Sequence, residues 1–321
     1  MIRTTLKMVA KGSVALAMLV LIAWLTGRIV SDRYGWSQWL LWIPTPGAIL
    51  VALLGFLGAL RPADKPHRRR RRLLVWGITA LALVGYFTLH EHRILHRPPS
   101  PTAGVRIVYW NPNSGTIRDG AEAPNMIFID LDADLTILAN ARGLKEYDPL
   151  AATLGPDGRA FRVRPFLFFT RLPLLEYQTL ISNGGIEVVH LRLDATATLG
   201  RVISIYAVDL PSDLTTSRME TAKRLRELIE SIAAPEPDIV IGDFNMTRGG
   251  AALRAAFPDL EHAYDQAGHS YGATYPRAFP LYHIDHVLLD DSLQALDYRL
   301  VNPGVGRHVI QVVELQTRDA P

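Results

Sequence analysis

The chain has 321 residues and no cysteine, which excludes disulfides, thiolate nucleophiles and cysteine-ligated metal sites. Its formal charge of +3 is unevenly distributed: residues 1–100 carry 14 Lys and Arg against 3 Asp and Glu, whereas residues 101–321 carry 20 against 28. The C-terminal part therefore has a net charge of −8, which is poorly suited to non-specific binding of long nucleic acids through their phosphates.

The N-terminal third contains apolar segments long enough to cross about 30 Å of hydrocarbon as helices. Pro44 and Pro46 are expected to kink or delay the second of them. A cleaved signal peptide would also explain the first segment, but two further apolar segments follow it, whereas a signal peptide precedes a soluble chain. We therefore expect a membrane module over residues 1–95 with three spans, at about 12–30, 39–60 and 73–90.

The placement of basic residues predicts the orientation of this module. Arg3, Lys7 and Lys11 precede the first span, and five arginines at 68–72 lie between the second and third spans. The positive-inside rule then puts the N-terminus and the arginines in the cytoplasm, and three crossings put the C-terminal domain outside. We expect a multi-pass protein of a bacterial inner membrane with a periplasmic or extracellular domain. A nucleic-acid or nuclear-targeting patch is the alternative interpretation of the arginines.

Beyond a Pro-rich linker at 96–104, the sequence alternates strand-like and helix-like segments. The clearest helix is 215–234, which has an apolar stripe at helical spacing. Several of the strands are apolar on both faces, as expected of central strands that are covered on both sides. A two-layer sheet sandwich with flanking helices and an open α/β sheet both fit this pattern. The expected strands are 105–111, 134–140, 202–208, 238–243, 283–289 and 308–315.

Polar residues recur at the ends of these strands in a fixed order. The chain resembles the endonuclease/exonuclease/phosphatase superfamily over about residues 104–316. The resemblance implies an α/β (α+β) domain at 105–316, a four-layer α/β/β/α sandwich preceded by the three transmembrane helices. It also implies phosphoester hydrolysis with Mg²⁺ or Mn²⁺ as the cofactor. The residues and motifs that carry it are Asn111, Asn140, "FFTRLPL", "AVDLPS", "GDFNMT", "GATYP", "HIDHVLL" and "GRHVIQVVEL".

The resemblance also implies roles for individual residues. Asp243 would orient or deprotonate the attacking water, and Asn245 would donate its amide to a phosphate oxygen. Asn111 would position the metal or the phosphate, Asp285 would hold the metal or a neighbouring donor, and His308 would bond the phosphate. Asp243 and Asn245 would share one face if the strand stays extended. The alternative is that these polar residues only cap strands and turns.

Three positions depart from the family pattern. Asn140 stands where the family has a metal-binding Glu, and it brings no charge to a hard cation. Asp209 stands where the family has His or Tyr facing the phosphate, and Arg307 replaces the Asp that orients the histidine. Loss of such an orienting carboxylate can cost about 10⁴ in rate in a well-studied analogue.

A rebuilt site is the alternative to an impaired one. Asp209 would then serve as a metal ligand, so the candidate ligands are Asn111, Asn140, Asp209 and Asp285, and Arg307 would stabilise the phosphate. Further candidate carboxylates are Asp130, Asp132 and Glu146. The histidines at 190, 262, 269, 283 and 286 do not have a metal-ligand spacing such as His-x-x-x-His, and His286 is expected to pack within its strand.

Two functions follow as hypotheses. The first is a membrane-tethered, metal-dependent phosphodiesterase or phosphatase that acts outside the cytoplasm, impaired by the changes at Asn140, Asp209 and Arg307. Its expected partners are membrane lipid and a small or lipid-linked phosphoester, and not long nucleic acid. The second is a pseudoenzyme that binds a phosphorylated ligand, a lipid or a partner protein. Cytoplasmic DNA repair would require the opposite topology.

Overall fold

The computed structural model describes residues 2–60, 66–97, 104–113, 125–141 and 147–318, with side chains from residue 12 onward. The chain divides into two compact units. The first covers Met1–Ile94 and Ser217–Met219, and the second covers Leu95–Thr216 and Glu220–Pro321. Most of the expected linker at 96–104, and the candidate carboxylate Glu146, lie outside the described residues.

The first unit is helical, and two of its helices are long and apolar enough to cross a membrane, Gly12–Val30 and Pro66–Glu91. The segment expected to span at 39–60 forms two shorter helices: the first ends at Leu41, and the second begins only at Thr45, after Pro44 and with Pro46 in its first turn, which is the delay expected from the prolines. The longer of these has 15 residues, or about 22 Å at 1.5 Å per residue, which is less than the apolar thickness of a bilayer. The elements are α1 (Ile2–Val30), α2 (Ser37–Leu41), α3 (Thr45–Ala59), α4 (Pro66–Tyr86) and a π-helical turn (Phe87–Glu91).

Small residues let the helices of this unit approach closely. A Cβ atom on Gly55 of α3 would lie 2.4 Å from the ring of Trp76 on α4, so only glycine fits there. Polar contacts join the C-terminal end of α1 and the start of α3 to the π-helical turn: Arg28 pairs with Glu91 at 3.4 Å, and Thr45 donates to the same Glu91 oxygen at 2.6 Å. The five arginines at 68–72 lie in the first turns of α4 and not in a loop between helices.

The second unit contains two six-stranded mixed sheets, which excludes the single open sheet as an alternative. Their strand orders are β11-β12-β1-β2-β4-β3 and β5-β6-β7-β8-β10-β9. The first sheet comprises β1 (Val105–Trp110), β2 (Leu135–Ala139), β3 (Arg159–Val163), β4 (Phe166–Thr170), β11 (Leu293–Val301) and β12 (Ile310–Thr317). The second comprises β5 (Leu174–Asn183), β6 (Ile186–Asp194), β7 (Val202–Asp209), β8 (Ile239–Asp243), β9 (Glu261–His262) and β10 (Asp285–Leu289).

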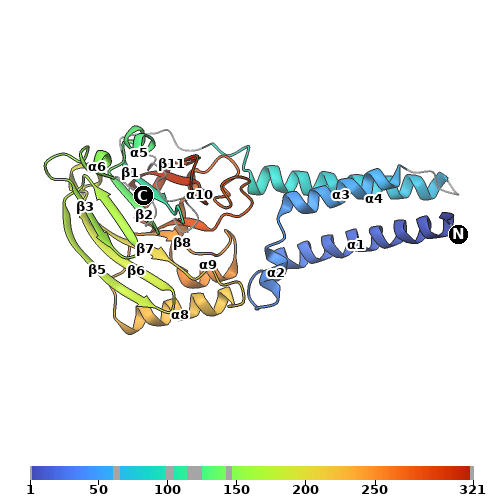
Figure 1. The fold of residues 1–321 in the computed structure, drawn as a ribbon, viewed down its shortest axis with the longest axis horizontal. Helices are drawn as coiled ribbons and strands as arrows, with labels where there is room; N and C mark the ends of the chain where they lie inside the picture. The colour runs from blue at the N-terminus through green and yellow to red at the C-terminus, as the bar shows by residue number, and fades with distance from the viewer. Residues whose placement is uncertain (1, 61–65, 98–103, 114–124, 142–146, 319–321) are drawn as a thin grey trace. The chain divides into compact units, whose positions relative to one another are not determined.

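Helices complete an α/β/β/α sandwich around these sheets, as expected. Phe128 of α5 and Leu150 of α6 pack with Val108 and Leu138 on the outer face of the first sheet. Figure 1 shows α8 and α9 beside the second sheet. The helices are α5 (Asn125–Leu131), α6 (Asp148–Ala151), α7 (Thr196–Leu199), α8 (Arg218–Ser231), α9 (Ala251–Ala256) and α10 (Ala263–Ala267).

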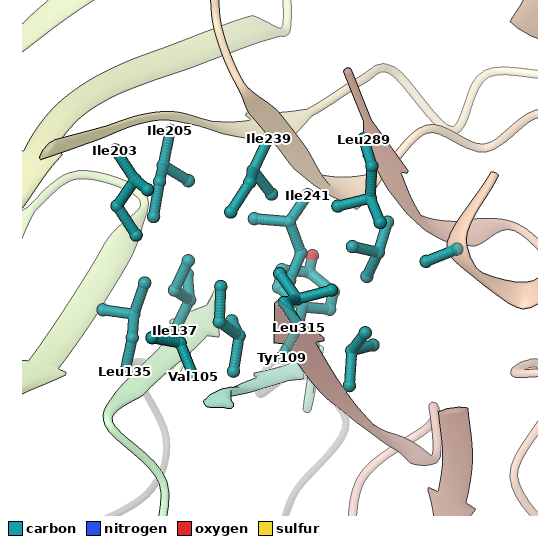
Figure 2. Close-up of a cluster of buried hydrophobic side chains, with 14 of the residues drawn as sticks. Val105, Tyr109, Leu135, Ile137, Ile203, Ile205, Ile239, Ile241, Leu289 and Leu315 are labelled. Carbon is teal, nitrogen blue, oxygen red and sulfur yellow. The ribbon is translucent and has the colours of Figure 1, made fainter. Parts of the chain in front are cut away.

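The inner faces of the two sheets form the main hydrophobic core (Figure 2). Ile205, Ile239 and Ile241 of the second sheet face Val105 and Ile137 of the first. Because side chains alternate along a strand, the same inward face continues from residue 241 to residue 243 of β8. The core therefore gives way to polar residues where these strands end, and that rim carries the candidate site.

Candidate active site

Three aspartates form a row across neighbouring strands of the second sheet. Asp209 of β7 is paired in register with Asp243 of β8, and Asp243 is paired with Asp285 of β10. Paired residues point to the same face, and here that is the inner face at the rim of the sandwich. Asp243 and Asp285 are both buried. A buried row of like charges requires compensating groups.

His308 supplies one of these groups. Its Nδ1 lies 2.8 Å from Oδ2 of Asp285, and its Nε2 lies 3.9 Å from Oδ2 of Asp243. The His308 ring is buried, and the backbone carbonyl of the same residue accepts a hydrogen bond from Trp110 Nε1 at 3.0 Å. The expectation that His308 lacks an orienting carboxylate is therefore wrong: Asp285, on the adjacent sheet, provides it.

Arg307 lies on the surface beside this histidine. It donates to Tyr275 Oη and lies over the Tyr275 ring, with 5.3 Å between the guanidinium carbon and the ring centroid. The Tyr275 ring is in turn 4.9 Å from the His308 ring. The change from Asp to Arg at this position thus places a positive charge at the edge of the site without disturbing the histidine.

Two asparagines hold Asp243 in place. Asn111 donates its side-chain amide to Oδ2 of Asp243 at 2.9 Å, and the backbone N–H of Asn245 donates to Oδ1 at 2.9 Å. Asn245 has a φ of 51°, so the backbone is not extended beyond Asp243 and the condition for Asp243 and Asn245 to share one strand face is not met. β8 ends at Asp243, because Asn tolerates the left-handed turn that follows. The Asn245 side chain donates to the carbonyl of Leu210 at 2.9 Å.

Asn140 and Asp209 form a second pair. The Asn140 amide donates to Oδ2 of Asp209 at 3.0 Å, so the two family departures contact each other across the two sheets. The structure thereby brings Asn111 and Asn140 of the first sheet to the three aspartates of the second.

The electrostatics of the row follow from burial. Loss of hydration raises the pKa of Asp243 above its usual range, and the neighbouring Asp285 charge raises it further. Burial likewise raises the pKa of Asp209, although the Asn140 hydrogen bond opposes this. Burial by itself lowers the pKa of His308, but the Asp285 charge and hydrogen bond outweigh it and raise that pKa to about 9. The carboxylates around His308 therefore favour its imidazolium form.

The donor atoms fit a hard divalent cation. Oδ1 of Asp285 is buried and has no hydrogen-bond partner within the described part of the chain. Ligand atoms of Asp243, Asp285 and His308 lie within 4.8 Å of one another. Mg²⁺ and Mn²⁺ favour carboxylate and amide oxygens, and a cation would relieve the repulsion within the row. Asp243 and Asp285 are the carboxylates close enough to share a cation, and Asn111, which is bonded to Asp243, brings an amide group beside them.

Other candidate residues lie elsewhere or were missed. Asp130 is exposed on α5, and the carboxylate of Asp132 pairs with Arg171 at the surface. Thr274 was missed as a site residue: its hydroxyl accepts the backbone N–H of Asp285 at 3.2 Å and so fixes that strand end. Thr274 is the threonine of the "GATYP" motif, so the motif could have indicated it as a site residue. Three further histidines gather in space although they are unrelated by sequence spacing, at 262, 283 and 286.

Comparison with known structures decides the fold. An endonuclease/exonuclease/phosphatase structure from Beutenbergia cavernae matches with a TM-score of 0.50 and 15% identity, covering 68% of this chain and 73% of the other. This chain has the endonuclease/exonuclease/phosphatase fold. A family protein from Bacteroides thetaiotaomicron covers 70% of this chain and 100% of its own at 16% identity and a TM-score of 0.49.

A mannosyl-6-phosphatase from Bacteroides thetaiotaomicron is also similar, at 15% identity and a TM-score of 0.49, covering 66% of this chain and 99% of the other. No family model matches the sequence, and neither does any curated protein. At these identities the similarity shows the fold, and the chemistry has to be argued from the site itself.

Proposed function

We propose that this protein is a divalent-metal-dependent phosphoester hydrolase, a phosphodiesterase or phosphatase tethered to a membrane by its N-terminal helices. The observation that best supports this proposal is the buried group of Asp243, His308 and Asp285. Asn111 donates to Asp243, and Oδ1 of Asp285 has no hydrogen-bond partner among the described residues. Such a site combines a proton acceptor, a cationic donor and a place for a cation, which are the groups that phosphoryl transfer needs.

Each side chain has a role set by its contacts. Asp243 accepts from Asn111 and from the Asn245 backbone, so its oxygens are fixed in space and can orient an attacking water. The Asp285 charge favours the imidazolium form of His308, whose Nε2–H can donate to a phosphoryl oxygen and offset the charge that develops there. The Asn245 side-chain amide donates one hydrogen to the Leu210 carbonyl, and its second hydrogen can donate to the substrate. A divalent cation, when bound, would supply Lewis-acid polarisation of the phosphoryl oxygen.

The substrate we propose is a small or lipid-linked phosphoester. A domain with a net charge of −8 over residues 101–321 does not attract long nucleic acids, and two apolar helices would keep the site near lipid. The basic residues near the start of α1 and α4 put the start of both helices in the cytoplasm by the positive-inside rule, which requires the segment 37–60 to return the chain across the membrane. On that basis we propose a bacterial inner-membrane location with a cytoplasmic N-terminus and a periplasmic or extracellular hydrolase domain. A reporter fused to the C-terminus tests this topology.

A pseudoenzyme that binds a phosphorylated ligand is the second candidate. The observation that favours it is the Asn140–Asp209 hydrogen bond, which replaces a charged metal ligand by a neutral amide and ties up an oxygen of the neighbouring carboxylate. Fewer charged ligands weaken the binding of a hard cation.

Hydrolysis of bis(p-nitrophenyl) phosphate by the full-length protein in nanodiscs separates the two. We expect turnover with Mn²⁺ or Mg²⁺ that chelation abolishes and that Asp243→Asn lowers by about 10²- to 10⁴-fold. The matched control is Asp130→Asn, which changes an exposed carboxylate on α5. Activity that survives Asp243→Asn would refute the site. Saturable phosphate binding without turnover, lost in Asp243→Asn, would identify the pseudoenzyme.

A further inference from the structure

Three histidine side chains cluster near the row of aspartates. One of them, His286, follows Asp285 on β10 and therefore points to the opposite face of the strand. The ring centroids of His262, His283 and His286 lie 4.8–5.0 Å from one another, and all three side chains are buried. Three imidazoles in mutual contact are costly unless their hydrogen bonds are ordered.

The contacts of His262 and His286 form a chain with a defined direction. The backbone N–H of Tyr264 donates to Nδ1 of His262 at 3.1 Å. Nε2 of His262 lies 2.7 Å from Nδ1 of His286, and Nε2 of His286 lies 2.8 Å from the carbonyl oxygen of Met246. One end of the chain is an amide that can only donate, and the other is a carbonyl that can only accept.

These two ends fix every proton between them. The Met246 carbonyl requires a proton on Nε2 of His286, which leaves Nδ1 of a neutral ring bare. That bare nitrogen accepts from Nε2–H of His262, whose own Nδ1 is then bare and accepts from Tyr264. Starting from the Tyr264 amide gives the same assignment. An additional proton on either ring would set two N–H groups against each other, so the chain exists only with both rings neutral.

The same geometry argues against a metal ion among the three rings. A tetrahedral site with Zn–N bonds of about 2.0–2.1 Å separates its nitrogens by about 3.3 Å, whereas Nε2 of His262 and Nδ1 of His286 are 2.7 Å apart. Ligation through Nε2 of His262 would also require a proton on its Nδ1, opposite the Tyr264 N–H. Burial lowers the pKa of His286 well below its usual value, which agrees with a neutral ring.

The accepting end of the chain lies in the loop 244–248, which carries Asn245. The strand segment 283–286 holds this loop at three points. The backbone N–H of Phe244 donates to the carbonyl of Ile284, and that of Arg248 donates to the carbonyl of His283, each at 3.0 Å. The middle point is the His286 imidazole on Met246, the residue after the left-handed Asn245.

We infer that His262 and His286 are positioning residues, which form a proton-ordered relay from the N-terminus of α10 to the loop 244–248 and thereby set the position of the Asn245 amide. Loss of the relay leaves the buried Met246 carbonyl unpaired and releases the loop at its centre. A catalytic group displaced by about 1 Å can lose about 10²-fold in rate. The kinetic part of this inference rests on the proposed hydrolase function, and the tautomer assignment does not.

The first test is therefore independent of activity. ¹⁵N-histidine NMR of the full-length protein in nanodiscs reports which ring nitrogen carries the proton, with His286→Gln and His262→Gln assigning the two signals. We expect both rings to carry it on Nε2. A proton on Nδ1 of either ring overturns the relay, and so does a chelator-resistant zinc ion lost in His262→Gln but not in Asp285→Asn.

The second test measures turnover of bis(p-nitrophenyl) phosphate. His286→Phe removes the donor, and we expect kcat to fall by about 10- to 100-fold with little change in KM. His286→Gln restores an amide donor for Met246 and should recover most of the loss. His190→Phe is the matched control, because His190 is buried on β6 and contacts Ser204. Equal losses in all three variants overturn the positioning role. Wild-type protein without turnover would refute the hydrolase proposal, while the NMR result still decides the relay.

Discussion

Replacing Asp285 by Asn tests whether the Asp285 charge keeps His308 protonated. The Asn side chain keeps the shape and an oxygen that can accept from Nδ1 of His308, which now lies 2.8 Å from Asp285. It removes the charge that contributes most to raising the His308 pKa to about 9, from an ordinary value of 6.5. That difference corresponds to about 3 kcal/mol in favour of the imidazolium, from the free energy of one pKa unit.

Burial opposes this preference, so the charges around His308 contribute more than the net value. In Asp285→Asn we therefore expect the His308 pKa to fall by about two units or more, and the ring to be largely neutral at pH 8. An NMR pH titration of the metal-free full-length protein measures this, with Asp130→Asn as the control. A His308 pKa that stays near 9 in the variant would refute the electrostatic reasoning.

Three further predictions follow from other contacts. Asn140→Glu adds a carboxylate beside Asp209, and we expect Mn²⁺ to bind on the order of tenfold more tightly by calorimetry. Burial holds His283 and His286 neutral with pKa values well below 6.5, so the unfolded state binds more protons in acid. The free energy of unfolding should fall below about pH 6.5, by up to about 1.4 kcal/mol per pH unit for each ring, in urea titrations. Gly242→Ala would place a Cβ 1.8 Å from a backbone carbonyl oxygen of β7, and we expect a loss of at least about 3 kcal/mol in thermal unfolding.

For each of these three predictions, one result would contradict the reasoning. Unchanged or weaker Mn²⁺ binding in Asn140→Glu would mean that the cation does not approach this side of the row. Stability that is flat between pH 6.5 and 5 would mean that the buried rings are not neutral. Gly249→Ala is the control for Gly242, because no atom lies within 4 Å of its Cβ position and only its φ of 80° resists substitution. That conformation costs about 1–2 kcal/mol, and an equal loss at both glycines would contradict the steric argument.

The sequence predicted much of the fold. A polar residue that ends a strand and continues the alternation of its buried side chains can be recognised from a few neighbouring residues alone. Asp243 illustrates this: it follows Ile239 and Ile241 at a spacing of two, so the alternation alone puts it at the end of the buried face. The prolines at 44 and 46 were recognised as breakers, but whether they kink a helix or end it depends on packing around them.

The contacts between elements could not be predicted in the same way. Asp285 and His308 are separated by 23 residues, and nothing local to either indicates that they meet; the sequence around Arg307 therefore pointed to a histidine without an orienting carboxylate. His262 and His286 likewise come from different strands, and only the pairing of β9 with β10 brings them together. The strand end at Asp243 agrees with the expected strand 238–243, but the sequence did not decide the backbone conformation of Asn245, because Asn fits both an extended strand and a left-handed turn.

The most direct test of the central claim is a crystal structure of the protein soaked with manganese and phosphate. The account predicts anomalous scattering from manganese at ligand distance from Asp285 and Asn111, with phosphate between the metal and the His308 Nε2. Manganese found only outside the row Asp209–Asp243–Asp285, or none there at saturating concentration, would contradict it.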